Sequence, residues 1–125
     1  MDAERQYDLF FLNDYFDNDL ESILPILKMY LEETPKELAS IESCLIRNDI
    51  AAAKAATHKI KTNVSMLSIR DQSSFINDMH LLNVDGSIPA AIKDQFAIFK
   101  GTIMAVMQEI RRDFFEKEDA AVDTR

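Results

Sequence analysis

The scarcity of glycine and proline constrains this chain more than any other feature of its sequence. Only two glycines and three prolines occur in 125 residues. Because tight hairpin turns depend on residues that accept a positive φ, above all glycine, the chain has little material for a hairpin-rich fold. The same scarcity excludes the glycine-rich loops GxGxxG and GxxxxGK[ST], which hold nucleotide phosphates. We therefore expect neither a β fold nor either common type of nucleotide-binding enzyme.

Apolar side chains recur at spacings of three and four residues along most of the chain. This is the period of an amphipathic α-helix, whereas a half-buried strand alternates with a period of two. Pro25 lacks a backbone N–H, which costs little helix stability if its helix begins near Ser22. If the helix begins at Asp19, Pro25 is expected to kink it. The pattern predicts a short helix or turn over 9–16, followed by a helix that begins at 19 or 22 and ends at a break at 34–35. A further helix is expected over 35–47, with Pro35 in its first turn, and another over 50–67, with Asp49 as its N-cap. The last two helices are expected over 70–83 and 89–115.

We expect an all-α fold. Four substantial helices joined by short connections must bury their apolar stripes against one another. An antiparallel up-down four-helix bundle with a short extra N-terminal helix does so most simply. A chain of 125 residues suffices for one domain with a real core. We expect that domain to cover residues 1–116, and residues 117–125, which lack helical periodicity, to form a disordered tail.

The charge and the cysteine content of the chain indicate which partners and which cellular compartment to expect. Acidic residues outnumber basic ones by 22 to 14, and the net charge is −8 at pH 7. That charge argues against binding to nucleic acid. The single cysteine, Cys44, fits a reducing compartment, and the sequence shows neither an apolar run of about 20 residues nor a signal peptide. We expect a cytoplasmic protein that binds neither nucleic acid nor a membrane.

The segment from Ile50 to Arg70 combines a histidine with an unusual local charge. It holds four basic residues and no acidic one, although the chain as a whole is acidic. At 100° per residue, the apolar residues share one face and His58 points away from it. A locally positive face on an acidic protein favours an anionic ligand or an acidic partner. Around His58 lie two lysines, Lys54 and Lys61, and a patch of small residues, Ala51, Ala55, Thr62 and Ser65.

A solvated surface histidine without a role is the plainest alternative for His58. A metal site has less support, because His58 and His80 supply too few ligands and neither follows a glutamate by three residues, as in ferritin-like bundles. Cys44 falls near the core face of its helix and is expected to pack rather than to act as a nucleophile. We therefore expect no metal and no cofactor.

Residues 55–61, Ala-Ala-Thr-His-Lys-Ile-Lys, resemble the signature of histidine-containing phosphotransfer (HPt) domains. That signature reads Ala-His-x-aliphatic-Lys followed by small residues. The resemblance covers roughly residues 7–82. It includes Tyr7-Asp8-Leu9, Asp19, the stretch 30–38 and the pair Asn48-Asp49 about ten residues before the histidine.

The chain departs from the family pattern at two kinds of position. Thr62 and Ser68 stand where members of the family often have glycine. Many members also carry a glutamate on the following helix, close to the position of His80, where it can bond the phosphorylated imidazole. Asn77 or His80 could give this support here.

The resemblance implies a phosphorelay intermediate that is not itself an enzyme. His58 would accept a phosphoryl group from a receiver-domain aspartate and pass it to another receiver, and Lys61 would stabilise the phosphoryl oxygens, with Lys54 on the other side. The small residues around His58 would let the partner approach. The partners would be receiver domains of response regulators or hybrid kinases, which supply the aspartate cluster and Mg²⁺. We expect the phosphocarrier to act as a monomer.

A second hypothesis comes from a different functional class. The same basic patch could belong to a helical adaptor that docks a receiver or a histidine kinase without being phosphorylated. The relation of His58 to Lys61 favours the phosphocarrier, because a pure adaptor needs no nucleophile there. Acid-labile, base-stable labelling by a phosphorylated receiver discriminates the two hypotheses.

Overall fold

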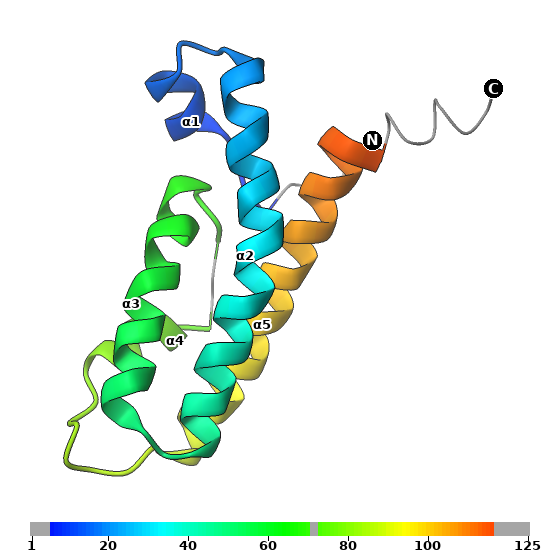
Figure 1. The fold of residues 1–125 in the computed structure, drawn as a ribbon. Coiled ribbons are helices and arrows are strands. Elements are labelled where there is room, and N and C mark those ends of the chain that lie inside the picture. Colours follow the sequence, from blue (N-terminus) through cyan, green and yellow to red (C-terminus); the bar gives the residue numbers. More distant parts are fainter. Residues whose placement is uncertain (1–5, 71–72, 117–125) are drawn as a thin grey trace.

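The computed structural model describes residues 6–70 and 73–116, and its regular elements are helices throughout. The all-α prediction is therefore confirmed for this part of the chain. Figure 1 shows how the helices are arranged. In chain order they are α1 (Phe10–Tyr15), α2 (Leu20–Ile46), α3 (Ile50–Met66), α4 (Phe75–His80), α5 (Ala90–Arg111) and the short π-helix η1 (Arg112–Glu116). The predicted tail, 117–125, lies outside the described residues.

The predicted break at 34–35 is wrong, because α2 runs unbroken through both Pro25 and Pro35. A proline inside a helix removes one backbone hydrogen bond and crowds the preceding turn. Pro35 is exposed, whereas Thr34 and Leu38 beside it are buried, so the buried face of the helix passes through this region without interruption. Packing of that continuous face outweighs the local cost. The helix begins directly after Asp19, the earlier of the two predicted starts.

The prediction of a helix over 70–83 is also wrong, because α4 has only six residues. The backbone N–H of Arg70 donates to the carbonyl of Gln6 at 3.2 Å, and that of Asp8 donates to the carbonyl of Leu67 at 2.9 Å. These bonds hold the chain after α3 against the N-terminal segment. Ser74 then adopts a left-handed conformation with φ of 63°, which no right-handed helix accommodates. The part of the chain that the structure describes therefore contains three long helices and two short ones, with η1 extending α5.

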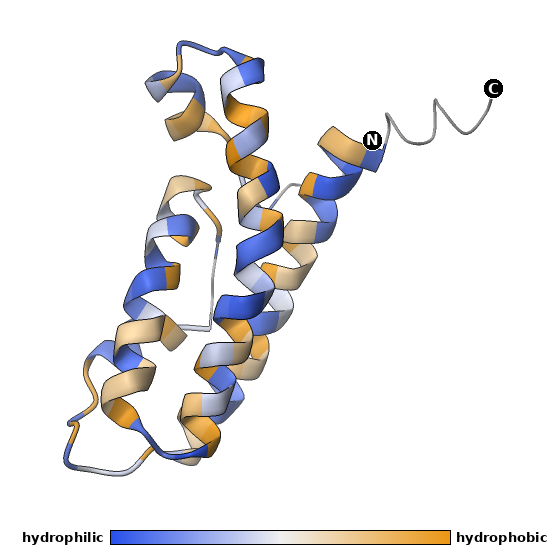
Figure 2. Cartoon of the chain, in the orientation of Figure 1, coloured by the Kyte–Doolittle hydropathy of each residue, from blue (hydrophilic) through white to orange (hydrophobic). Residues whose placement is uncertain are grey.

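The helices pack in a cycle. α2 contacts α3 and α5, α4 contacts the same two helices, and α1 lies against α2. α2 runs in the opposite direction to α3 and α5 (Figure 1). Hydrophobic and hydrophilic positions are interspersed along the long helices, as in amphipathic helices that bury one face (Figure 2).

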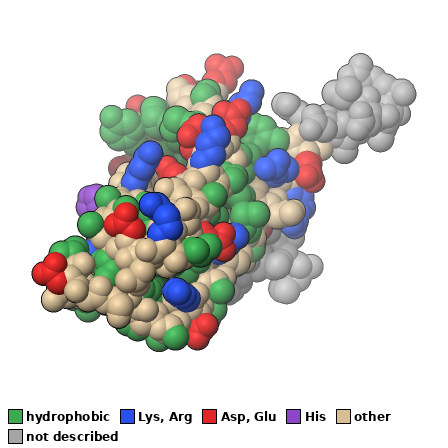
Figure 3. All heavy atoms as spheres, turned by 60° about the horizontal axis from the view of Figure 1, so that its bottom comes forward, with side chains coloured by type: hydrophobic (Ala, Val, Ile, Leu, Met, Phe, Trp, Pro, Cys, Tyr) green, Lys and Arg blue, Asp and Glu red, His purple; other side chains and the backbone are tan. Residues whose placement is uncertain are grey.

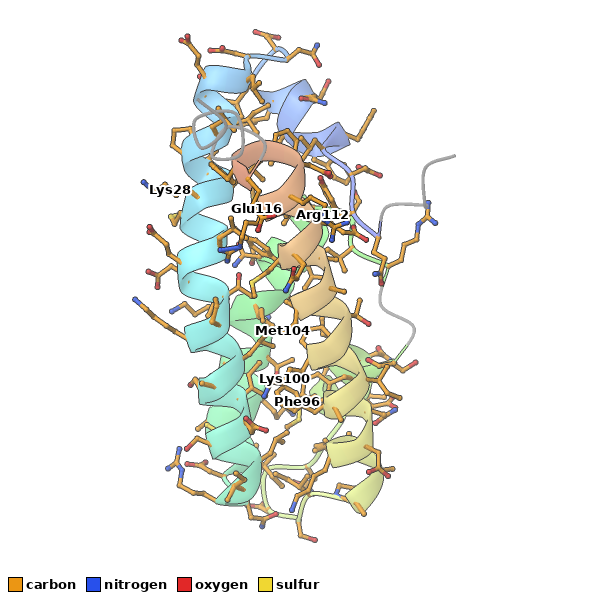
Figure 4. All side chains as sticks on the ribbon, turned by 90° about the vertical axis from the view of Figure 1, so that its right-hand side faces the viewer. Lys28, Phe96, Lys100, Met104, Arg112 and Glu116 are labelled. Carbon is orange, nitrogen blue, oxygen red and sulfur yellow. The ribbon has the colours of Figure 1, made fainter. Side chains whose placement is uncertain are left out.

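Aromatic side chains join α4 to α5 at the centre of the core. The ring of Phe75 lies 5.2 Å from that of Phe96 and 5.3 Å from that of Phe99, centroid to centroid. Phe75 and Phe99 are fully buried. α2 and α5 lie side by side (Figure 4). Lys100 of α5, labelled in the figure, pairs with Glu42 of α2 at 3.2 Å. Cys44 is buried and free, as its position near the core face predicts.

No helix in the described ranges 6–70 and 73–116 has the length and apolarity needed to cross a bilayer.

Candidate functional site

α3 forms where the sequence predicts it, for identifiable local reasons. The Asp49 side chain caps its N-terminus by accepting a hydrogen bond from the backbone N–H of Ala52 at 3.2 Å. An alanine-rich run with good helix propensity follows. The predicted core face is confirmed, because all its members are buried: Ile50, Ala53, Thr57, Ile60, Val64 and Leu67.

His58 lies on the outer side of α3 and is exposed, as predicted. Its imidazole borders two grooves. One groove lies between α3 and α4, and the other between α3, α2 and α1. His58 therefore stands on the ridge that separates two surfaces of different chemistry.

The groove toward α4, which we call the basic groove, has a volume of about 450 Å³. Two lysines, two histidines and an asparagine line it, with no aspartate or glutamate among its lining residues. By contrast, acidic and basic side chains are interspersed over the face in Figure 3. The lining residues are Lys54, His58, Lys61, Asn77 and His80, together with Thr57, Ile69, Ser74 and Ile76.

Lys61 and Lys54 differ in how they enter the basic groove. Lys61 is exposed, and none of the ion pairs within the described part of the chain involves it. Lys54 is half-buried, and its ammonium donates a hydrogen bond to the backbone carbonyl of Leu82 at 2.7 Å. Leu82 follows α4, so Lys54 ties α3 to the chain just beyond that helix. Lys61 is thus the lysine whose ammonium is open to a ligand.

Asn77 and His80, the two residues predicted as supports, both belong to α4 and both line the basic groove with His58. Their backbone is well anchored. Phe75 and Met79 of the same helix are fully buried, and Asp78 accepts a hydrogen bond from the side chain of Gln95 on α5 at 2.6 Å. The short α4 therefore presents both polar side chains opposite α3 in a fixed place.

The small residues predicted to surround His58 are all exposed: Ala51, Ala55, Thr62 and Ser65. Thr62 borders the groove on the far side of His58 from α4, not the basic groove. Lys59 also lies on that far side, beside Glu33 and Glu37 of α2. It thus faces acidic residues that have no counterpart in the basic groove.

The second groove, which we call the apolar groove, also has a volume of about 450 Å³. Its apolar side chains come from α1, from α2 and from the end of α3 with the residue after it, namely Leu12, Ile26, Leu27, Met29, Tyr30, Met66 and Leu67. Large apolar side chains are exposed on α1 and α2, with Phe11 at 53% and Met29 at 55% exposure. The sequence did not predict this groove. Its lining residues come from three separate segments of the chain, so no local pattern brings them together.

Tyr30 forms part of the floor of the apolar groove. Burial raises the pKa of its phenol well above the ordinary value, and the nearby Glu37 adds to this effect. The hydroxyl therefore stays protonated at neutral pH and takes no part in acid–base chemistry there.

Within residues 6–70 and 73–116, no group of three or more histidine, cysteine, aspartate or glutamate side chains is placed so that it could hold a metal ion.

Comparisons of the chain with models of known protein families, with curated proteins and with solved structures found no match.

Proposed function

We propose that this chain is a phosphorelay intermediate of the HPt type, in which His58 accepts a phosphoryl group from a receiver-domain aspartate and donates it to another receiver. One observation carries the proposal. On a chain with a net charge of −8, an exposed histidine borders a groove lined by two lysines and a second histidine, with no carboxylate among its lining residues. Such a groove attracts an anionic group to the imidazole.

The proposed phosphoryl transfer requires few functional groups from this chain. The lone pair of the His58 Nε2 attacks phosphorus, the bond from phosphorus to the receiver's aspartyl oxygen breaks, and the aspartate leaves as a carboxylate. Donation to the next receiver is the same exchange in reverse. Lys61 places a positive charge beside the phosphoryl oxygens, while the receiver supplies the aspartate cluster and the Mg²⁺.

The packing of the helices is compatible with the HPt type. The contacts of α2 with α3 and α5, and of α4 with the same two helices, support a bundle in which α4 is the short fourth member and α1 is the extra N-terminal helix. In the proposed relay the protein acts as a cytoplasmic monomer. One domain carries the acceptor, and the receiver carries the rest of the active site.

The apolar groove supports docking of a receiver next to His58. Met29, one of its lining residues, is 55% exposed and offers apolar area that a partner can bury. The exposed small residues of α3, such as Ala55 and Thr62, leave room for close approach. The same groove also favours the second candidate, an adaptor that docks a receiver without taking phosphate.

Phosphate transfer separates the two candidates. The chain is incubated with phosphorylated receiver domains, and transferred label is tested for stability in acid and in alkali. A phosphocarrier acquires label that acid removes and alkali spares, and His58→Gln acquires none. His80→Gln, which keeps the acceptor, still takes label. An adaptor binds the receiver in a pull-down or by calorimetry, and the wild-type chain stays unlabelled.

A further inference from the structure

The short helix α1 presents aromatic side chains to solvent. Phe10, Phe11 and Tyr15 are 66%, 53% and 80% exposed, and the rings of Phe10 and Phe11 meet edge to face with their centroids 5.4 Å apart. Tyr15 follows Phe11 by four residues, so it lies on the same side of the helix. At about 200 Å² for a whole aromatic side chain, the three leave roughly 400 Å² of surface in water. We call this surface the aromatic face. Exposed apolar patches of this size are often functional.

The backbone of α1 is anchored, so the aromatic face is a fixed feature of the fold. Leu12, on the opposite side of the helix, is only 1% exposed and belongs to the core. The side chain of Asp8 accepts a hydrogen bond from the backbone N–H of Phe10 at 3.0 Å, at the start of the helix. Just beyond its end, the backbone N–H of Asn18 donates to the carbonyl of Asn13 at 2.7 Å.

Carboxylates accompany the aromatic face. Residues 6–27, which contain α1 and the start of α2, hold five acidic residues and no basic one. Two of the acidic residues are engaged within the chain, because Asp8 bonds the backbone of Phe10 and Asp19 accepts a hydrogen bond from the Ser22 hydroxyl at 2.8 Å. The other three are exposed, and no ion pair between described residues involves them: Asp14, Asp17 and Glu21. The charge of this end of the molecule is thus opposite to that of the basic groove.

We propose that the aromatic face of α1 is a docking surface for a protein segment in which arginine or lysine accompanies apolar residues. The rings bury the apolar side chains of such a segment and stack against its cationic groups. Asp14 follows Phe10 by four residues and Phe11 by three, so its carboxylate lies beside the rings and pairs with a cation held there. An acidic segment or an anionic membrane surface is repelled. A second copy of this chain, with a net charge of −8, is disfavoured for the same reason.

The aromatic face is separate from the two grooves that border His58. Leu12 is the one residue of α1 that lines the apolar groove, and the exposed rings on the other side of α1 line neither groove. A partner on the aromatic face therefore leaves His58 accessible and can bind at the same time as a receiver. This inference does not rest on the proposed phosphate transfer, since it concerns a second surface with the opposite charge preference.

Binding of a labelled peptide to the full chain tests the proposal. The probe is a short fluorescein-labelled peptide in which arginine and leucine alternate, and the readout is its fluorescence anisotropy at constant ionic strength. We expect a dissociation constant of about 10–100 μM, as for a small transient interface. The same peptide with glutamate in place of each arginine is expected not to bind. A wild-type chain that binds both peptides equally, or neither, overturns the proposal.

Matched substitutions separate the aromatic face from the net charge of the chain. Phe11→Ser is expected to weaken binding of the arginine peptide about tenfold, and Asp14→Asn about threefold. Ile98→Ser and Asp94→Asn, which change an exposed apolar residue and an exposed carboxylate of α5, are expected to bind like the wild type. Because all four side chains are exposed, each variant is expected to fold. Equal weakening by the α1 and the α5 variants shows that the peptide follows net charge alone, and contradicts the proposal.

Two further measurements distinguish other occupants of the aromatic face. The wild-type chain and Phe11→Ser are both expected to sediment as monomers, and a wild-type dimer that Phe11→Ser dissociates assigns the face to a second copy. Phosphate transfer from a receiver is expected to be the same in both chains, and a loss in Phe11→Ser assigns the face to receiver docking. Either result overturns the proposal. Labelling of His58 decides the proposed function by itself, so the two proposals fail independently.

Discussion

Replacement of Lys61 by alanine tests how the basic groove acts on the phosphoryl group. Lys61 follows His58 by three residues on α3, lines the same groove and is exposed. At about 4 Å, a unit charge in water interacts with another by about 1 kcal/mol, and hence with a phosphoryl dianion by about 2 kcal/mol. Exclusion of water by a docked receiver strengthens this, as in a charge-assisted hydrogen bond of about 1.5–3 kcal/mol. Lys61→Ala is therefore expected to slow transfer by roughly 10- to 100-fold.

The assay is single-turnover transfer from a phosphorylated receiver at constant ionic strength, with the lifetime of the phosphohistidine measured alongside. Lys61→Arg keeps the charge, imperfectly placed, and is expected to retain much of the rate. Lys59→Ala is the matched control, because Lys59 neighbours His58 on the opposite side, beside Glu33 and Glu37. If Lys59→Ala slows transfer as much as Lys61→Ala at the same salt concentration, the effect is long-range attraction to an acidic receiver, and the local role of Lys61 is refuted.

Three further predictions concern stability and are checked by urea unfolding. Burial raises the pKa of the Tyr30 phenol above its value in the unfolded chain, so its contribution to the free energy of unfolding is complete below about pH 10 and is lost as the pH rises further. Tyr30→Phe is expected to remove this loss of stability at alkaline pH, and an equal loss in both proteins would contradict the raised pKa. Asp49→Ala removes the cap on Ala52 and is expected to destabilise by about 1 kcal/mol, whereas no change would show that the cap contributes nothing. Pro35→Ala restores a backbone donor on the exposed side of α2 and is expected to stabilise by about 1–3 kcal/mol, and a loss of stability would mean that the proline fits this helix without cost.

The sequence predicts α3 well because several local signals agree there. Asp49 supplies the cap, alanines supply propensity, and the spacing from Ile50 to Leu67 places one face in the core and His58 outside it. Each signal acts within about one turn of helix. The outward direction of His58 and the exposure of its small neighbours follow from the same periodicity.

The errors arise where contacts distant in sequence decide the structure. Pro35 predicts a break, but the buried face on both sides of it holds α2 together. The chain after α3 is held against the N-terminal segment by two backbone bonds between residues far apart in sequence, Arg70 with Gln6 and Asp8 with Leu67. Likewise, the bond from Lys54 to Leu82 spans 28 residues, so no local pattern reveals that this lysine is occupied. The roles of His58 and Lys61 in phosphate transfer stay predictions.

The site of phosphate attachment tests the central claim most directly. The wild-type chain is exposed to phosphorylated receivers, digested at neutral to alkaline pH, and the phosphopeptide is identified by mass spectrometry. We predict phosphate on Nε2 of His58 alone and no labelling of His58→Gln. The free energy of unfolding of that variant is expected to lie within about 0.5 kcal/mol of the wild-type value, because the substituted side chain is exposed. A wild-type chain that no receiver labels, or a His58→Gln variant that is labelled undiminished, contradicts the account.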